Sequence, residues 1–106
     1  MPKFLCKASY TSEGARGVMK EGGTARRAAV EKLIASAGGK LEAFYFAYGE
    51  TDVYLLAELP DTTASVALSL AVNATAAVRL SMTPLITPEE FDAATKKALT
   101  YRPPGA

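Results

Sequence analysis

Apolar and polar residues alternate in four stretches of the chain, with the period of two that is typical of half-buried β-strands. These stretches are residues 3–10, 40–48, 53–59 and 78–83. Only residues 49–52 separate the second stretch from the third, and they include a glycine and an aspartate. Because such residues favour tight turns, we expect these two strands to pair as a β-hairpin.

Helical spacing of apolar residues appears in two of the intervening segments. The first helix is predicted to begin after Thr24 as N-cap, to run through residues 25–37, and to end at Gly38. The second follows Asp61 as N-cap and presents small residues over 64–74. Each helix connects two strands.

A third, short helix is predicted near the end of the chain, over residues 88–97. Thr87 and Glu90 have the spacing of a capping box, and Pro88 occupies the first helical position. By contrast, residues 14–23 contain four glycines, which argue against a continuous helix there. We expect a mobile or substrate-facing loop in that segment.

The resulting order is β-α-β-β-α-β with an appended helix. This is the ferredoxin-like, split βαβ arrangement, an α+β fold in which a four-stranded antiparallel sheet carries two helices on one face. We expect one domain over residues 1–98 and a tail over 99–106.

The hairpin strands are apolar on both faces, which an open sheet covered on one side does not require. We expect Tyr45 and Val53 to pack under the helices. The opposite face is predicted to be a contact between subunits, formed by Phe44, Phe46, Tyr54 and Leu56. Exposed on a monomer, these side chains would form about the largest apolar patch that soluble monomers tolerate. The alternative is that a loop or the tail of the same chain covers this face.

The charge, cysteine and histidine content of the chain restricts the classes of binding partner and the types of catalytic or metal site that we expect. The 106 residues include 12 basic and 11 acidic side chains, so neither nucleic acid nor an anionic membrane is expected as a partner. The single cysteine, Cys6, lies in an apolar strand and is interpreted as a buried, inert thiol. No leader pattern is seen, and we expect a cytoplasmic location. The absence of histidine excludes the histidine-based triads and most zinc and haem sites, so no metal or cofactor is expected.

The remaining candidates for binding chemistry are tyrosine, acid and arginine side chains at strand ends. We expect a ligand site near Tyr10, Tyr48, Asp52 and Arg79. Such a set could orient a carboxylate, hydrogen-bond an oxygenated molecule, or supply a general base. The alternatives are that Asp52 bonds backbone amides at the hairpin and that the tyrosines are core residues. The pair at positions 26–27, two arginines, is interpreted as a solvated helix face.

Three stretches resemble the GYD domain family of small bacterial proteins: FYFAYGETDVY at 44–54, ELPD at 58–61 and LITPEEF at 85–91. Thr51 stands where the family usually has tyrosine, directly before Asp52, so a role for that phenol is not available to this chain. The resemblance implies a ferredoxin-like domain of the dimeric α/β-barrel type, a group that includes cofactor-independent monooxygenases, isomerases and small-ligand binders.

These observations predict a homodimer or larger homo-oligomer that binds a small molecule between sheet and helices, either as a binding module or as a cofactor-independent oxygenase or isomerase. The alternative is an oligomeric scaffold or interaction protein without catalysis.

Overall fold

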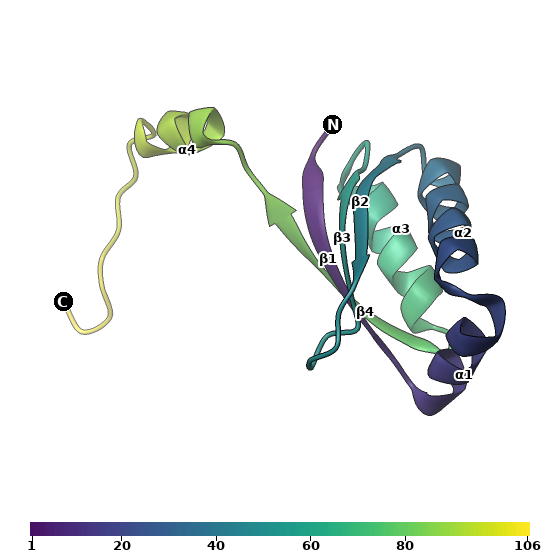
Figure 1. Ribbon diagram of the computed structural model, residues 1–106. Helices are drawn as coiled ribbons and strands as arrows, with labels where there is room; N and C mark the ends of the chain where they lie inside the picture. The colour runs from purple at the N-terminus through teal and green to yellow at the C-terminus, as the bar shows by residue number, and fades with distance from the viewer.

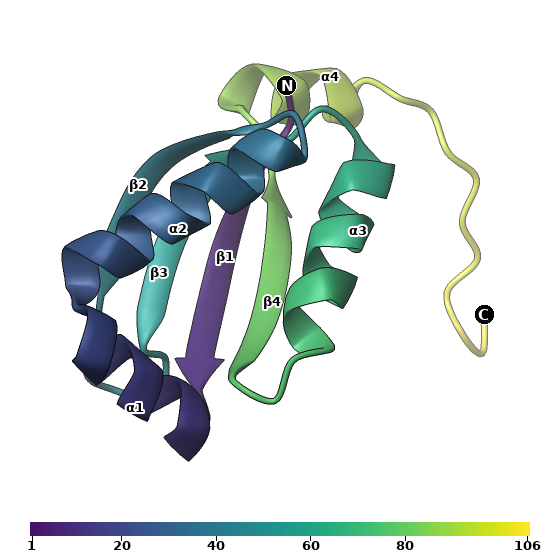
Figure 2. The same cartoon turned by 90° about the vertical axis from the view of Figure 1, so that its right-hand side faces the viewer.

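The computed structural model describes residues 1–106, and it has the ferredoxin-like architecture that the element order predicts. Its elements are β1 (Lys3–Tyr10), α1 (Ser12–Glu21), α2 (Gly23–Ser36), β2 (Lys40–Phe46), β3 (Val53–Glu58), α3 (Thr62–Asn73), β4 (Val78–Leu85) and α4 (Pro88–Thr95). The strands form one antiparallel sheet in the order β2-β3-β1-β4. Helices α2 and α3 cover one face of this sheet (Figure 1, Figure 2). None of the helices has the length and apolar character needed to cross a membrane.

The core lies between the sheet and helices α2 and α3. Its largest fully buried side chains are Cys6, Ile34, Val53 and Leu59, which come from β1, α2, β3 and the end of the hairpin. Each odd-numbered residue from Val53 to Leu59 is buried, as the alternation in the sequence predicts. The buried position of Cys6 agrees with its interpretation as an inert thiol.

Burial raises the pKa of the Cys6 thiol from its ordinary 9.0 to about 11. The folded state therefore holds this proton more tightly than the unfolded chain does. The protonated thiol of Cys6 therefore contributes to the free energy of unfolding below about pH 9. This contribution is lost as the pH rises through about 11. We expect Ellman's reagent at about pH 8 to leave the native thiol unmodified and to titrate one thiol per chain in guanidinium chloride. Rapid labelling of the native protein would contradict this placement.

A β-bulge in β2 changes which hairpin residues face the helices. The pairing with β3 passes from Leu41↔Ala57 directly to Ala43↔Leu56, which leaves Glu42 as the extra residue. Phe44 therefore pairs with buried Leu55 and lies on the helix side, against the core. The register beyond the bulge is shifted by one residue relative to a regular strand.

The predicted faces of the hairpin are wrong for three residues as a result. Phe46 pairs with Val53 and lies beside Gly23 of α2, so Phe44 and Phe46 do not share a face with Tyr54 and Leu56. Tyr45 pairs with Tyr54 and is 70% exposed, on the side away from the helices. We call this side the open face. It carries the apolar side chains of Leu5, Tyr45, Tyr54, Leu56 and Leu85.

The glycine-rich segment after β1 is a helix, and the prediction of a loop there is wrong. Thr11 begins α1 as N-cap, because its hydroxyl oxygen accepts a hydrogen bond from the Gly14 amide at 3.2 Å. The next helix begins two residues earlier than predicted. Its N-cap is Gly22, with φ of 92°, and Thr24 lies inside α2. Gly38, with φ of 82°, follows the end of α2 as predicted.

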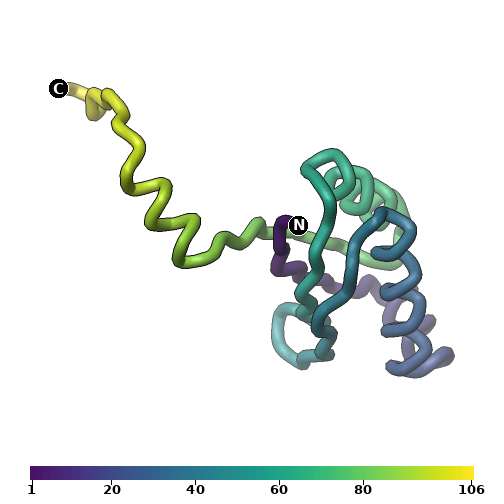
Figure 3. Tube along the Cα trace, turned by 90° about the horizontal axis from the view of Figure 1, so that it is seen from above, coloured from purple at the N-terminus to yellow at the C-terminus, as the bar shows by residue number.

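The segment after β4 extends away from the rest of the chain. Figure 3 shows α4 and the residues after it lying apart from the sheet and the other helices. Helix α4 has the predicted capping box between Thr87 and Glu90, but none of its residues is buried. The radius of gyration is 16.9 Å, whereas a compact domain of this size has about 13 Å. We call residues 86–106 the C-terminal arm. It carries four exposed large apolar side chains, Ile86, Phe91, Leu99 and Tyr101.

Candidate functional site

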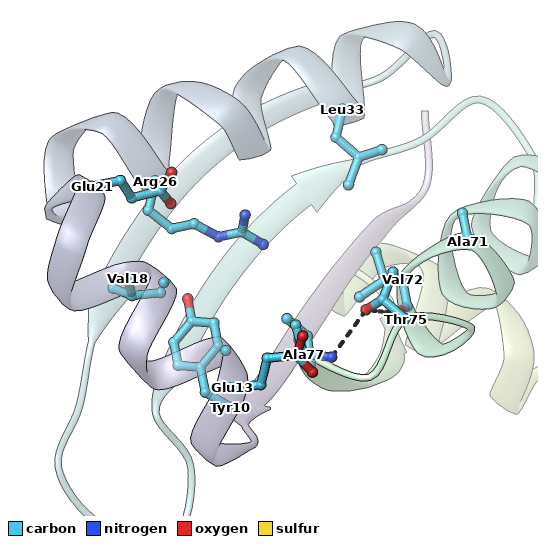
Figure 4. Close-up of a pocket in the computed structure, with 13 residues that line it drawn as sticks. Tyr10, Glu13, Val18, Glu21, Arg26, Leu33, Ala71, Val72, Thr75 and Ala77 are labelled. Carbon is cyan, nitrogen blue, oxygen red and sulfur yellow. Dashed lines mark hydrogen bonds between the residues drawn. The ribbon is translucent and has the colours of Figure 1, made fainter.

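A cavity of about 460 Å³ lies between α1, α2, α3 and the adjoining ends of β1 and β4 (Figure 4). Its size falls within the range of small-molecule sites in proteins. The walls combine apolar side chains with a few polar groups. The lining residues are Tyr10, Glu13, Gly14, Gly17, Val18, Glu21, Arg26, Leu33, Ala71, Val72, Thr75, Ala77 and Val78.

Two side chains with hydrogen-bonding capacity meet in this cavity. The Tyr10 ring extends from the end of β1 toward the Arg26 guanidinium, which reaches inward from α2 (Figure 4). The Nε atom of Arg26 is buried and has no hydrogen-bond partner. Buried polar atoms are nearly always paired in native proteins, so an unpaired Arg26 Nε indicates a missing partner.

The environment of Tyr10 keeps its hydroxyl protonated. Burial raises the pKa of the phenol above its ordinary value of 10.0, and the neighbouring Arg26 guanidinium opposes part of that rise. Asp52 and Glu21 add small contributions that raise the pKa further. At neutral pH the hydroxyl is therefore available as a hydrogen-bond donor beside a permanent positive charge.

A second, apolar cavity of about 40 Å³ lies deeper, between the sheet and the two covering helices. It shares Tyr10, Arg26, Leu33, Val72 and Val78 with the larger cavity. Among its 14 lining residues Arg26 is the only charged one. The site thus has a polar group at the boundary between an open outer chamber and an apolar interior.

Close backbone contacts fix the elements that form the cavity. The Thr11 amide donates to the Ala77 carbonyl at 3.0 Å, and the Thr11 hydroxyl donates to the Ala76 carbonyl at 2.7 Å. Gly14 brings α1 against the same carbonyl of Ala77. These contacts join the start of α1 to the turn before β4.

Glu13 and Glu21 lie at the mouth of the cavity, where both side chains are exposed to solvent. Water screens their charges in part, in contrast to the buried part of Arg26, and they are the only acidic side chains among the lining residues. Nowhere in the chain do three or more His, Cys, Asp or Glu side chains come together in a group that could hold a metal ion.

The structure does not bring the four predicted site residues together. Tyr10 lines the cavity, but Tyr48 is fully exposed in the hairpin loop. Asp52 accepts a hydrogen bond from the Tyr10 amide at 2.8 Å, so its carboxylate holds the end of β1 in place. Arg79 lines a separate shallow groove on the open face, with Lys7 and Ser81 among its neighbours.

The interpretation of both arginines at 26–27 as a solvated face is wrong for Arg26. Arg27 is exposed, whereas Arg26 is half-buried and lines both cavities. The sequence did contain a signal. Arg26, Val30 and Leu33 fall at i, i+4 and i+7, so the arginine continues the apolar stripe of α2.

The family model of the GYD domain matches residues 4–95. The chain belongs to the GYD domain family. The GYD match includes every residue that lines the two cavities and reaches the end of α4. No curated protein and no solved structure matches the chain.

Proposed function

We propose that this GYD domain protein is an oligomeric small-molecule-binding domain whose ligand occupies the cavity between α1, α2, α3 and the sheet. The observation that carries the proposal is the Arg26 side chain, which lines a cavity large enough for an organic molecule and whose buried Nε has no hydrogen-bond partner in the chain. An empty scaffold gains nothing from leaving that group unpaired, because an unsatisfied buried donor costs about 1–3 kcal/mol.

Self-association is supported by two apolar surfaces that a single chain leaves uncovered. One is the open face, with Tyr45, Tyr54 and Leu56, and the other is the C-terminal arm. Both belong to the same chain, and the arm leaves the sheet at the end of β4, beside the open face (Figure 1). In the proposed dimer, the C-terminal arm of each copy lies on the open face of the other copy, so both apolar surfaces are covered.

A cofactor-independent enzyme would use the same cavity. The Tyr10 hydroxyl and Arg26 are placed to stabilise negative charge on a bound oxygen, and Glu13 and Glu21 are the carboxylates that line the cavity and would accept a proton. Binding without catalysis requires only Tyr10 and Arg26. We therefore propose binding as the function and catalysis as an extension of it.

Blocking the cavity should abolish ligand stabilisation without unfolding the protein. Ala71 lines the cavity from α3 and is exposed, so Ala71→Phe places a ring in the outer chamber. A ligand at one hundred times its Kd stabilises a protein by about 2.7 kcal/mol, which raises the Tm of a domain of this size by about 10 °C or more. We expect thermal melts against organic acids and phenols to show this shift in the wild type and not in Ala71→Phe.

The matched control is Ala67→Phe, one turn earlier on α3, where the side chain is exposed and outside the cavity. Its ligand response should equal that of the wild type. Equal shifts in both variants would place binding elsewhere, and no shift with any compound in any of the three proteins would contradict the proposal.

A further inference from the structure

We propose that the cavity selects a monocarboxylate with an apolar body, whose carboxylate pairs with the Arg26 guanidinium and whose apolar part points toward the inner cavity. The inference rests on the proposed function and assigns the class of its ligand.

The guanidinium of Arg26 determines the charged end of the ligand. The Arg26 guanidinium reaches into the cavity, and its buried Nε has no partner in the chain (Figure 4). A guanidinium is a planar fork that binds a carboxylate through two parallel hydrogen bonds. A neutral carbonyl can accept only at one oxygen and carries no charge to balance the arginine. The Tyr10 hydroxyl, which extends toward the same position, supplies a further donor (Figure 4).

The mouth of the cavity disfavours a second negative charge on the ligand. Glu13 and Glu21 both lie there, so a second carboxylate or a phosphate projecting from the cavity would meet like charge. A cationic ligand would be attracted to the mouth but would be repelled by Arg26 farther in. A ligand with one negatively charged end can pair with Arg26 inside the cavity without placing a charge beside the two glutamates at the mouth.

The apolar lining of the interior indicates that the part of the ligand away from its carboxylate is apolar. Leu33, Val72 and Val78 line both the outer and the inner cavity, and apart from Arg26 no lining residue of the inner cavity is charged. Each methylene group that moves from water into such surroundings contributes about 0.8 kcal/mol. Affinity is therefore expected to rise with the length of the apolar part until the space is filled.

Four six-carbon probes separate charge from size: hexanoate, hexanamide, hexylammonium and hexanedioate. We expect titration calorimetry to show that hexanoate binds the wild type at least about tenfold more tightly than the other three, because charge-assisted hydrogen bonds are about twice as strong as neutral ones. Arg26→Met, which keeps an apolar stem as far as the position of Nε and removes the rest of the guanidinium, should lose about tenfold to a hundredfold in affinity for hexanoate.

The control for the arginine is its neighbour. Arg27→Met removes the same charge from an exposed position outside the cavity and should leave the affinity for hexanoate unchanged. Circular dichroism melts of both variants establish that they are folded. In addition, the Nε–Hε NMR resonance of Arg26 should move on adding hexanoate and stay in place on adding hexylammonium.

The outcomes distinguish this inference from the proposed function. If hexanamide or hexylammonium binds as well as hexanoate, or if Arg26→Met retains full affinity, the carboxylate assignment is overturned while the cavity remains a binding site. If none of the four probes binds the wild type, and no other organic compound stabilises it, the proposed function fails as well.

Discussion

Replacing Gly14 with alanine is expected to lower the free energy of unfolding by about 3 kcal/mol, a large share of the stability of a domain this size. A Cβ atom at this position would lie directly on the carbonyl oxygen of Ala77 and 2.9 Å from its carbonyl carbon. That carbonyl also accepts from the Thr11 amide at 3.0 Å, so the backbone cannot move away without breaking the contact. Urea unfolding followed by circular dichroism measures the loss.

Gly17 provides the matched control in the same helix. No heavy atom lies within 4 Å of a Cβ built at this position, so Gly17→Ala should raise the stability by about 0.5–1 kcal/mol through helix propensity alone. Opposite signs for the two substitutions would establish that α1 is held against the turn before β4 as described. A cost below about 1 kcal/mol for Gly14→Ala would show that α1 does not pack there.

Replacing Leu56 with aspartate is expected to weaken self-association by about a hundredfold or more. Leu56 lies on β3 near the centre of the open face, where it pairs with Leu5 and Ala43. A charge at the centre of an apolar contact loses its hydration without gaining a partner, which costs more than the loss of the leucine alone. Sedimentation equilibrium over a range of concentrations measures the change.

Leu70→Asp is the control for this prediction. Leu70 is a leucine that is 66% exposed, whereas Leu56 is half-buried, and Leu70 lies on α3, outside both the open face and the C-terminal arm. Its substitution should leave the association constant unchanged. Tyr45→Asp gives a second probe of the open face at a side chain that is already 70% exposed in the single chain. A monomeric wild type, or equal dissociation by Leu70→Asp, would contradict self-association through the open face.

Much of the fold could be predicted from local patterns because those patterns have local causes. The bounds of β1, the Asp61 N-cap of α3, and the capping box of α4 all depend on residues a few positions apart. The order of the sheet then follows from the order of the elements, since the split βαβ arrangement leaves few alternatives. None of these features needs information from a distant part of the chain.

The features that the sequence did not predict depend on contacts across the fold. The bulge at Glu42 has no signal of its own, and one extra residue moves Phe44 and Phe46 to the helix face. Gly14 is needed inside a helix because Ala77, far along the chain, leaves no space for a side chain at that position. In both cases a tertiary contact overrides the local preference.

The candidate site could be predicted in part. Tyr10 was identified from its position at a strand end, and it lines the cavity. Asp52 lies close to that residue but bonds its backbone amide, so proximity in the fold did not place the carboxylate in the cavity. Arg26 was missed because two adjacent arginines suggest a solvated surface, although only Arg27 is exposed.

The most direct test of the account is an amide chemical-shift map of the labelled protein with the tightest-binding of the four six-carbon probes. Binding in the cavity predicts the largest shifts at residues of its walls from three different elements, such as Tyr10, Val18 and Val72, with little change on the open face at Leu5 or Ser81. Shifts confined to the open face, or no shifts with any probe, would contradict the assignment of this cavity as the ligand site.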